Sequence, residues 1–195
     1  MEVLRSEVLK IVKKKDPLYT ILDDLAYKAK NVYNSALYLQ KEIYENTGYA
    51  YSYFELCKIY HEKYGNYGLT SVMVNLILKN VATTVSNYFK AYKEYQRNPK
   101  RFNGEPKFPR FKDSINGRYI VTFYYQQVRF KDGKIYFPQK LNVPPIETRL
   151  DLTIPNGFFS EYEMNPLREV RIIPQLDSYK IELVYKKNIE EPNTD

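Results

Sequence analysis

The sequence predicts an α+β protein: a small antiparallel β-domain, either a barrel or a sandwich, into which about three helices are inserted. In the first half of the chain, apolar residues recur at three- and four-residue steps, which is typical of amphipathic helices. After Gly117 the pattern changes to short runs of β-branched and aromatic residues between turn signals. A strand-like run over residues 3–12 precedes the helices. Because no other strand lies near it in sequence, we expect this run to join the later sheet.

Each predicted helix has a recognisable start. Asp16, followed by proline, is a strong N-cap, and the apolar repeat continues from there over seven turns to residues 46–48. Ser52–Glu55 has the pattern of a capping box, so a second helix should begin there and run to about Tyr64. A hydroxyl residue at position 70 or 71 caps a third helix, which leads into a basic segment.

The predicted strands lie in the second half of the chain. Tyr119–Val128 is a run of β-formers, Asp132-Gly133 marks a hairpin turn, and residues 150–154 and 169–173 alternate between apolar and polar. A further turn leads into a strand at residues 179–185. We therefore divide the chain into a first strand (1–15), a helical insert (16–100), a basic linker (101–118), the β-domain (119–187) and a polar linker (188–195).

The third helix has one apolar and one polar face when its residues are placed at intervals of about 100°. The polar face carries amides, hydroxyls and basic groups, which are the donor types that meet phosphates and base edges. A charged outer face is also the commonest helix surface, and most such faces only meet water. The polar positions are Asn75, Lys79, Thr83, Ser86, Lys90, Lys93, Glu94 and Arg97. The apolar positions are Met73, Ile77, Val81, Val85, Tyr88, Tyr92 and Tyr95.

A basic segment with interleaved aromatic residues follows this helix. Between Tyr88 and Arg118 there are nine Lys or Arg residues and three Asp or Glu residues, whereas the net charge of all 195 residues is +7. The positive charge is therefore concentrated here, which favours a polyanionic partner such as nucleic acid. We expect the polar helix face and this segment to form one continuous surface that faces phosphates.

Other features exclude several classes of function. One cysteine, Cys57, excludes an internal disulfide and a paired-cysteine metal site, and one histidine, His61, argues against a histidine-based metal site or catalytic dyad. The carboxylates are scattered and no nucleotide-binding glycine motif occurs, so we identify no catalytic and no metal-binding residue. No apolar run is long enough to span a membrane and no signal-peptide core is found. We expect a cytoplasmic protein with no membrane partner.

Several stretches resemble the N-terminal half of the TnpB (OrfB) proteins, which are encoded by bacterial and archaeal insertion sequences and are related to the type V CRISPR effectors. The most specific stretch is Gly104–Lys112, with the sequence GEPKFPRFK. The others are Tyr33–Leu37, Leu69–Tyr92, Thr122–Lys134 and Lys180–Tyr185, so the likeness spans nearly the whole chain.

The resemblance implies both a fold and a function. Members of the family are RNA-guided endonucleases that cut DNA, and their N-terminal part is an OB-like wedge β-barrel interrupted by a helical recognition insert. The chain would hold a guide RNA and read a short motif that flanks the target in double-stranded DNA, while base pairing reads the rest. In the family a RuvC-type nuclease domain follows with three acidic residues, and Mg²⁺ is expected only there. The chain stops at Asp195, about where that domain would begin, so we expect no catalysis and no cofactor in this chain and a nuclease domain that normally shares it.

The resemblance also implies roles for individual residues. Six side chains are expected to meet the flanking DNA motif, because amides and lysines can pair with base edges. These are Tyr53, Ser71, Asn75, Lys79, Thr122 and Gln126. Six basic side chains are expected to bind phosphates of RNA or of the heteroduplex, which contributes affinity rather than specificity. These are Lys90, Arg97, Arg101, Lys107, Arg110 and Lys112.

Two other interpretations of the sequence remain open. The chain could be a stand-alone DNA-binding regulator, derived from a transposon, that occupies DNA without cutting it. It could also be a protein–protein interaction module that uses its tyrosine-rich surface, in which case the basic segment is incidental.

Overall fold

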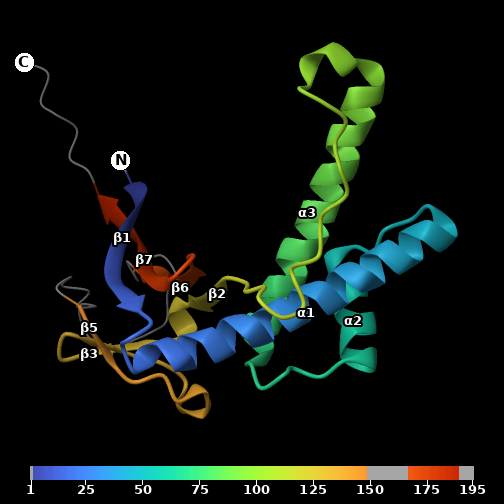
Figure 1. Ribbon diagram of the computed structural model, residues 1–195. Coiled ribbons are helices and arrows are strands. Elements are labelled where there is room, and N and C mark those ends of the chain that lie inside the picture. The colour runs from blue at the N-terminus through green and yellow to red at the C-terminus, as the bar shows by residue number, and fades with distance from the viewer. Residues whose placement is uncertain (1, 149–166, 189–195) are drawn as a thin grey trace, which may run out of the picture. The chain divides into compact units, whose positions relative to one another are not determined.

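The computed structural model describes residues 2–148 and 167–188 (Figure 1). The chain forms two compact units, a β-unit from residues 1–26 and 120–195 and a helical unit from residues 27–119. The long helix α1 (Leu18–Thr47) begins in the β-unit and continues in the helical unit.

The main sheet of the β-unit has the strand order β1-β7-β6-β2, and every neighbouring pair is antiparallel. Its strands are β1 (Glu2–Lys13), β2 (Val121–Tyr124), β6 (Leu167–Pro174) and β7 (Ser178–Asn188). β1 pairs with β7 along its whole length, with one irregularity between Val8 and Lys10. The prediction that the first strand joins the later strands is therefore confirmed.

A second sheet has three strands in the order β3-β4-β5. It consists of β3 (Arg129–Lys131), β4 (Lys134–Tyr136) and β5 (Ile146–Glu147). The β3–β4 hairpin turns at Asp132 and Gly133, whose φ angles of 50° and 69° are both positive, as a two-residue turn that matches strand twist requires. The hairpin predicted from the Asp-Gly pair is confirmed.

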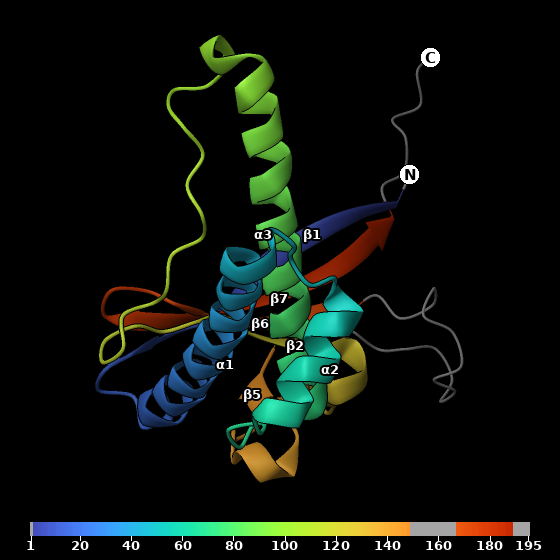
Figure 2. The same cartoon turned by 90° about the vertical axis from the view of Figure 1, so that its right-hand side faces the viewer.

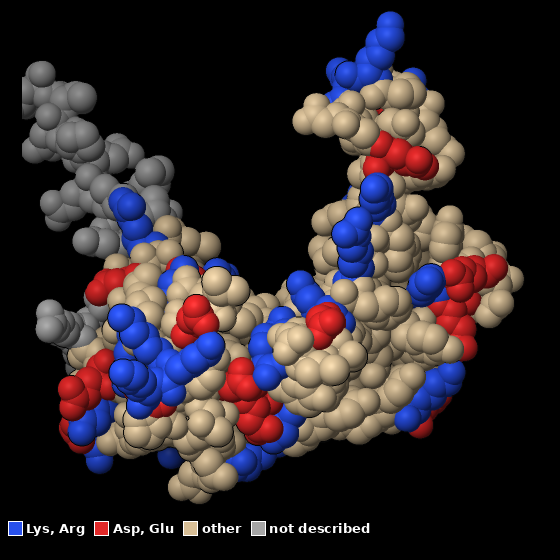
Figure 3. Space-filling view, viewed as in Figure 1, with Lys and Arg blue, Asp and Glu red and all other residues tan. Residues whose placement is uncertain are grey.

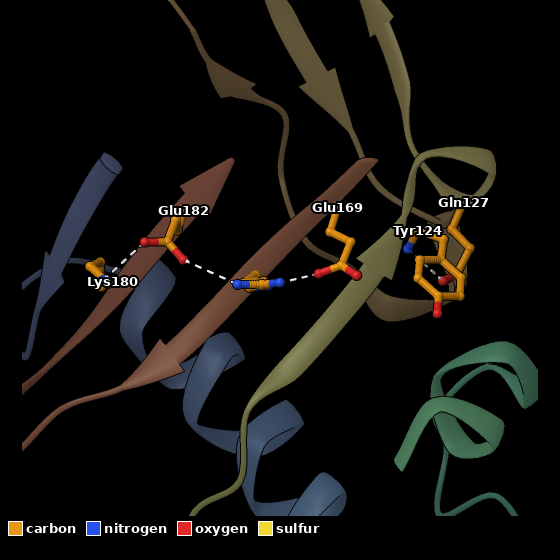
Figure 4. Close-up of polar contacts among 6 residues, drawn as sticks. Tyr124, Gln127, Glu169, Lys180 and Glu182 are labelled. Atoms are coloured by element: carbon orange, nitrogen blue, oxygen red, sulfur yellow. Dashed lines mark hydrogen bonds and ion pairs between the residues drawn. The ribbon is translucent and has the colours of Figure 1, made fainter. Parts of the chain in front are cut away.

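Within the described residues, the β-unit does not close into the barrel that the resemblance implied. Its described strands form two open sheets, and no ladder joins one sheet to the other. One reason lies at Tyr125–Gln127, which form a 3₁₀ turn instead of continuing the predicted Tyr119–Val128 strand. The Tyr124 N–H donates to Gln127 Oε1 at 3.1 Å, so the turn satisfies a donor that a longer ladder would have used (Figure 4). The predicted strand at residues 150–154 and the linker residues 189–195 lie outside the described residues.

The core of the β-unit is formed by one face of the main sheet and the first turns of α1. Tyr179 on β7 links the two, because its ring packs edge-on against Tyr19 with centroids 5.2 Å apart. Its hydroxyl donates to Asp23 Oδ1 at 2.7 Å. The buried apolar side chains around this contact are Val12, Leu18, Leu22, Leu25, Val121, Phe123, Val170, Ile172, Ile181 and Leu183.

The helical unit contains the rest of α1, then α2 (Tyr53–Lys63) and α3 (Ser71–Arg97), so the three predicted helices are confirmed. A complete capping box at Ser52 starts α2, and the Thr70 hydroxyl accepts from the Met73 N–H at 3.1 Å to cap α3. None of the described helices combines the length and the apolarity that a membrane span needs. The buried face of α3 consists of Met73, Val74, Ile77, Leu78, Val81, Ala82 and Val85.

The distal half of α3 extends past α1 and α2, and the chain returns beside it (Figures 1 and 2). We call residues 102–118 the return segment. Phe108 of this segment lies 5.3 Å from Tyr88, and Phe102 lies 5.8 Å from Tyr95, measured between ring centroids. The predicted apolar face of this half is therefore half-buried, and it packs on the returning chain instead of in the core.

Replacing Tyr179 with Phe should lower the free energy of unfolding, because it removes the donor to Asp23 and keeps the ring that packs on Tyr19. A hydrogen bond to a charged group contributes about 1.5–3 kcal/mol, and urea unfolding should show a loss of that order. Tyr185→Phe on the same strand is the matched control, since no hydrogen bond of the Tyr185 hydroxyl is found within the described ranges. Equal stability of the two variants would contradict this role for Tyr179.

Candidate nucleic-acid interface

Side chains of α1 hold the return segment. Asn34 makes two reciprocal bonds with the backbone of Lys112: its amide donates to the Lys112 carbonyl and its carbonyl accepts from the Lys112 N–H, both at 2.9 Å. The hydroxyl of the preceding residue, Tyr33, donates to the Arg110 carbonyl at 3.2 Å. These bonds satisfy backbone groups of an extended segment that belongs to neither sheet.

A lysine and a tyrosine pair complete this contact. Lys30 is only 2% exposed, and its Nζ donates to the Ser114 carbonyl at 2.7 Å. Tyr33 stacks on Tyr119 with 4.6 Å between ring centroids, and burial raises the pKa of Tyr119 to about 12. We call Lys30, Tyr33 and Asn34, with these partners, the α1 clamp. It fixes the backbone of the return segment at the carbonyls of Arg110, Lys112 and Ser114.

The six basic residues predicted to bind phosphates are all exposed, but their surroundings differ. Arg101 forms an ion pair with Glu94 at 3.4 Å. Lys112 Nζ lies 5.8 Å from the centre of the Tyr33 ring. The other four have no ion-pair partner among the residues that the structure describes; they are Lys90, Arg97, Lys107 and Arg110. Figure 3 shows Lys and Arg side chains along the arm formed by α3 and the return segment.

Two of these cations, Lys90 and Arg110, line two separate grooves. The tyrosine groove, about 780 Å³, is lined by residues 48–53 and by positions on α3 that include Lys90 and Lys93. The Arg110 groove, about 430 Å³, contains Arg110 and Tyr88, and the two grooves share no lining residue. On α3 the direction of Tyr88 is roughly 150° from that of the two lysines. The aromatic side of α3 therefore divides the surface that the sequence predicted to be continuous.

Three candidates for reading DNA bases lie on the first half of α3. Asn75 Oδ1 is 2.9 Å from His61 Nε2, so Asn75 joins α3 to α2. The Ser71 hydroxyl accepts from Asn66 Nδ2 at 3.1 Å, within the loop that precedes α3. Lys79 is exposed and has no partner in the described part of the chain. Of the three, only Lys79 makes no side-chain hydrogen bond within the described residues.

The remaining candidates are divided between the units. Tyr53 is half-buried at the start of α2 and lines the tyrosine groove. Thr122 is opposite Arg171 in the β2–β6 register, and the exposed Gln126 donates to the Tyr125 hydroxyl at 3.1 Å. Thr122 and Gln126 belong to the β-unit, whereas Tyr53 belongs to the helical unit.

A row of charged side chains crosses the main sheet beside Thr122 (Figure 4). Arg171 Nε is 2.7 Å from Glu169 Oε2, and Arg171 Nη1 is 3.8 Å from Glu182 Oε2. Lys180 Nζ lies 3.1 Å from Glu182 Oε1. Two carboxylates therefore neutralise Arg171, and this sheet face offers a polyanion less unpaired positive charge than the α3 arm does.

Sequence reasoning missed the clamp residues, and of the groove tyrosines it predicted Tyr53 but missed Tyr49 and Tyr51. A signal for the clamp was present, since Lys30, Tyr33 and Asn34 recur at the three- and four-residue spacing of one helix face. A signal for the groove was the run Tyr49–Tyr53, in which every second residue is a tyrosine.

The chain matches no protein-family model, and no curated protein is significantly similar to it. The clamp, the two grooves and the exposed cations are therefore the features from which a function can be inferred.

Replacing Asn34 with Ala should speed hydrogen exchange of the Lys112 amide, because this N–H loses its acceptor. The loss of a bond worth about 1–2 kcal/mol corresponds to roughly 5- to 30-fold faster exchange. Asn31→Ala is the matched control on the same helix, since Asn31 is half-buried and makes no side-chain hydrogen bond within the described ranges. Unchanged protection at Lys112 in the Asn34 variant would show that the clamp does not hold the segment.

Proposed function

We propose that this chain is the nucleic-acid-binding part of an RNA-guided DNA endonuclease that resembles the TnpB family. It would hold a guide RNA and read a short motif in the double-stranded DNA beside the target. The proposal assigns no catalytic step and no metal to the residues described above.

One observation carries the proposal. Lys90, Arg97, Lys107 and Arg110 are exposed and have no ion-pair partner among the described residues. Such cations can bind a phosphate without first breaking an ion pair, and each contact releases counterions from the nucleic acid. The backbone carbonyl of one of them, Arg110, is held by the α1 clamp, which lowers the cost of ordering the protein when it binds.

The order of the units supports the same proposal. β1 pairs with β7, and the helical unit is connected between β1 and β2, which is the order of a wedge domain with a recognition insert. Under the proposal the β-unit corresponds to the wedge barrel of that family, although its described strands form two open sheets.

Different residues would have different roles in this complex. The basic residues of the return segment and of distal α3 would grip phosphates. Lys79 is the strongest candidate for a base contact, because lysine pairs with the acceptors of guanine and its ammonium group is exposed. Asn75 would have to exchange its contact with His61 for an adenine edge. Tyr53, Ser71, Thr122 and Gln126 would make supporting contacts to the flanking motif.

Replacing Lys107, Arg110 and Lys112 together with Ala should weaken binding to all DNA and RNA sequences alike. For duplex DNA the slope of log K against log salt should become shallower by up to about 2.7, or roughly 0.9 for each lost phosphate contact. Gel-shift or anisotropy titrations over a range of salt concentrations measure both quantities.

The control for this triple variant removes the same charge from lysines that are already ion-paired. Lys10, Lys14 and Lys63 meet Asp16, Asp177 and Glu42 at 2.7, 2.7 and 3.8 Å. Their replacement with Ala should change the slope much less. Equal effects of the two triple variants, or binding that ignores salt, would refute the proposed role of the return segment.

Replacing Lys79 with Ala should relax the preference for the flanking motif instead of weakening binding uniformly. A lost base contact costs about 1–3 kcal/mol on the preferred sequence and little on others. The measurement is the affinity for a set of duplexes that differ in one base pair at a time. A uniform loss over the whole set would assign Lys79 to phosphate binding.

A further inference from the structure

The tyrosine groove combines two kinds of chemistry on facing elements. The connection between α1 and α2 contributes Tyr49 and Tyr51, and the first residue of α2 contributes Tyr53 (Figure 2). α3 contributes Lys90 and Lys93, and none of the lining residues is acidic. A ligand that suits this groove therefore carries both negative charge and flat rings.

The α1–α2 connection is already fixed without a ligand. The fully buried Gln40 donates from Nε2 to the Tyr51 carbonyl at 2.8 Å. Glu55 Oε2 accepts from the Ser52 N–H at 2.8 Å and from the Tyr49 hydroxyl at 2.6 Å. Binding does not have to order this connection, so a conformational-entropy cost is avoided.

Tyr49 has the properties of a stacking platform. Its ring is 49% exposed, and its hydroxyl is held by Glu55. Hydrogen bonds from Ser52 and Tyr49 lower the pKa of Glu55, so the carboxylate that holds the ring stays ionised near neutral pH. Tyr51 lies near Tyr49 with 6.4 Å between centroids and 90° between planes, so the two rings are not stacked face to face on each other.

The two lysines act from the same side of α3. They are three residues apart, which corresponds to about 4.5 Å along the helix axis and about 60° in direction. Both are exposed, and neither has an ion-pair partner in the part of the chain that the structure describes. Both ammonium groups are therefore available to neighbouring phosphates of one strand.

The tyrosines determine which form of nucleic acid the groove accepts. In a duplex each base is stacked between its neighbours, whereas an unpaired base can stack on an aromatic side chain. Lysine–phosphate contacts alone make no such distinction. A groove with ring faces beside cations therefore favours unpaired nucleotides.

We propose that the tyrosine groove binds a single-stranded segment of nucleic acid, with bases stacked on Tyr49 and Tyr51 and phosphates bound by Lys90 and Lys93. This inference rests on the proposed nucleic-acid-binding function and specifies the form of strand that one groove takes. A phosphate backbone with unpaired bases is common to RNA and DNA, so the test includes both.

The first measurement compares base-bearing and abasic strands on the full, unaltered chain. Fluorescent oligothymidine, oligouridine and an abasic oligonucleotide of the same length and charge are titrated by anisotropy. The base-bearing strands should bind about tenfold or more tightly than the abasic strand, because stacking on an aromatic side chain contributes at each base. The ratio of the thymidine and uridine affinities shows whether the groove prefers DNA or RNA.

The second measurement uses variants of the groove residues, with Tyr49 changed in one and Lys90 and Lys93 changed in the other. Tyr49→Leu should weaken binding of the base-bearing strand by about tenfold and leave abasic binding unchanged. Tyr38→Leu is the matched control, because Tyr38 is 50% exposed, donates to Glu42 at 3.3 Å and does not line the groove. Lys90→Ala combined with Lys93→Ala should reduce the salt slope for single strands by about 1.4.

The possible outcomes separate this inference from the proposed function. If base-bearing and abasic strands bind equally while duplex binding stays salt-dependent, the inference is overturned and the proposed function stands. If no nucleic acid binds, both are overturned. A polyglutamate peptide that binds as tightly as the oligonucleotide would also overturn the inference, because charge alone would then fill the groove. If Tyr49→Leu does not fold, the abasic comparison on the unaltered chain decides.

Discussion

Asn34 uses both ends of its side-chain amide to bind the backbone of Lys112, and the arrangement of the helical unit depends on this contact. An extended segment outside a sheet leaves its N–H and C=O groups to water or to side chains. Here α1 supplies the partners, with Lys30 and Tyr33 acting on the carbonyls of Ser114 and Arg110. The backbone of a basic segment is thereby fixed, although the segment itself forms no regular structure over most of its length.

A cluster of aromatic side chains also holds the return segment, against α3. Phe108 is wedged beside Tyr88, with Phe89 and Tyr44 within 6.5 Å between ring centroids. This cluster joins the return segment to α3 and at the same time separates the tyrosine groove from the Arg110 groove. The cations of this region are consequently distributed over two surfaces of different composition. One has tyrosines opposite lysines, and the other has an arginine beside phenylalanines.

The parts of the fold that follow a local pattern could be predicted from the sequence. The apolar repeats of α1 and α3, the capping box at Ser52 and the Asp132-Gly133 turn depend on residues a few positions apart, and all are present. The clamp could not be predicted in the same way, because its partners are 78 residues apart in the Asn34–Lys112 pair and join a side chain to a backbone. The spacing of Lys30, Tyr33 and Asn34 places them on one face of α1, but it does not show which backbone they bind. The 3₁₀ turn at Tyr125–Gln127 was missed because it lies within a run rich in β-formers, and the Gln127 side-chain bond to the Tyr124 N–H ends the strand there. The polar face of α3 was predicted, but the aromatic packing that separates its lysines from Arg110 was not. Periodicity gives the direction of each side chain on one helix, and it does not show which other segment packs against that helix.

The pairing of β1 with β7 has a consequence for how the chain folds during synthesis. β1 precedes every other described strand in the chain and pairs with β7, the last described strand, so β1 stays without this partner until the chain between them and β7 itself have been made. During that time Leu4, Val8 and Ile11, which remain 65%, 48% and 43% exposed even in the folded chain, form an apolar row on an unpaired strand. The helical unit draws its own contacts from one continuous stretch and can form first. A nascent chain whose helical unit has already formed therefore still exposes the apolar row of β1 until β7 is available to pair with it.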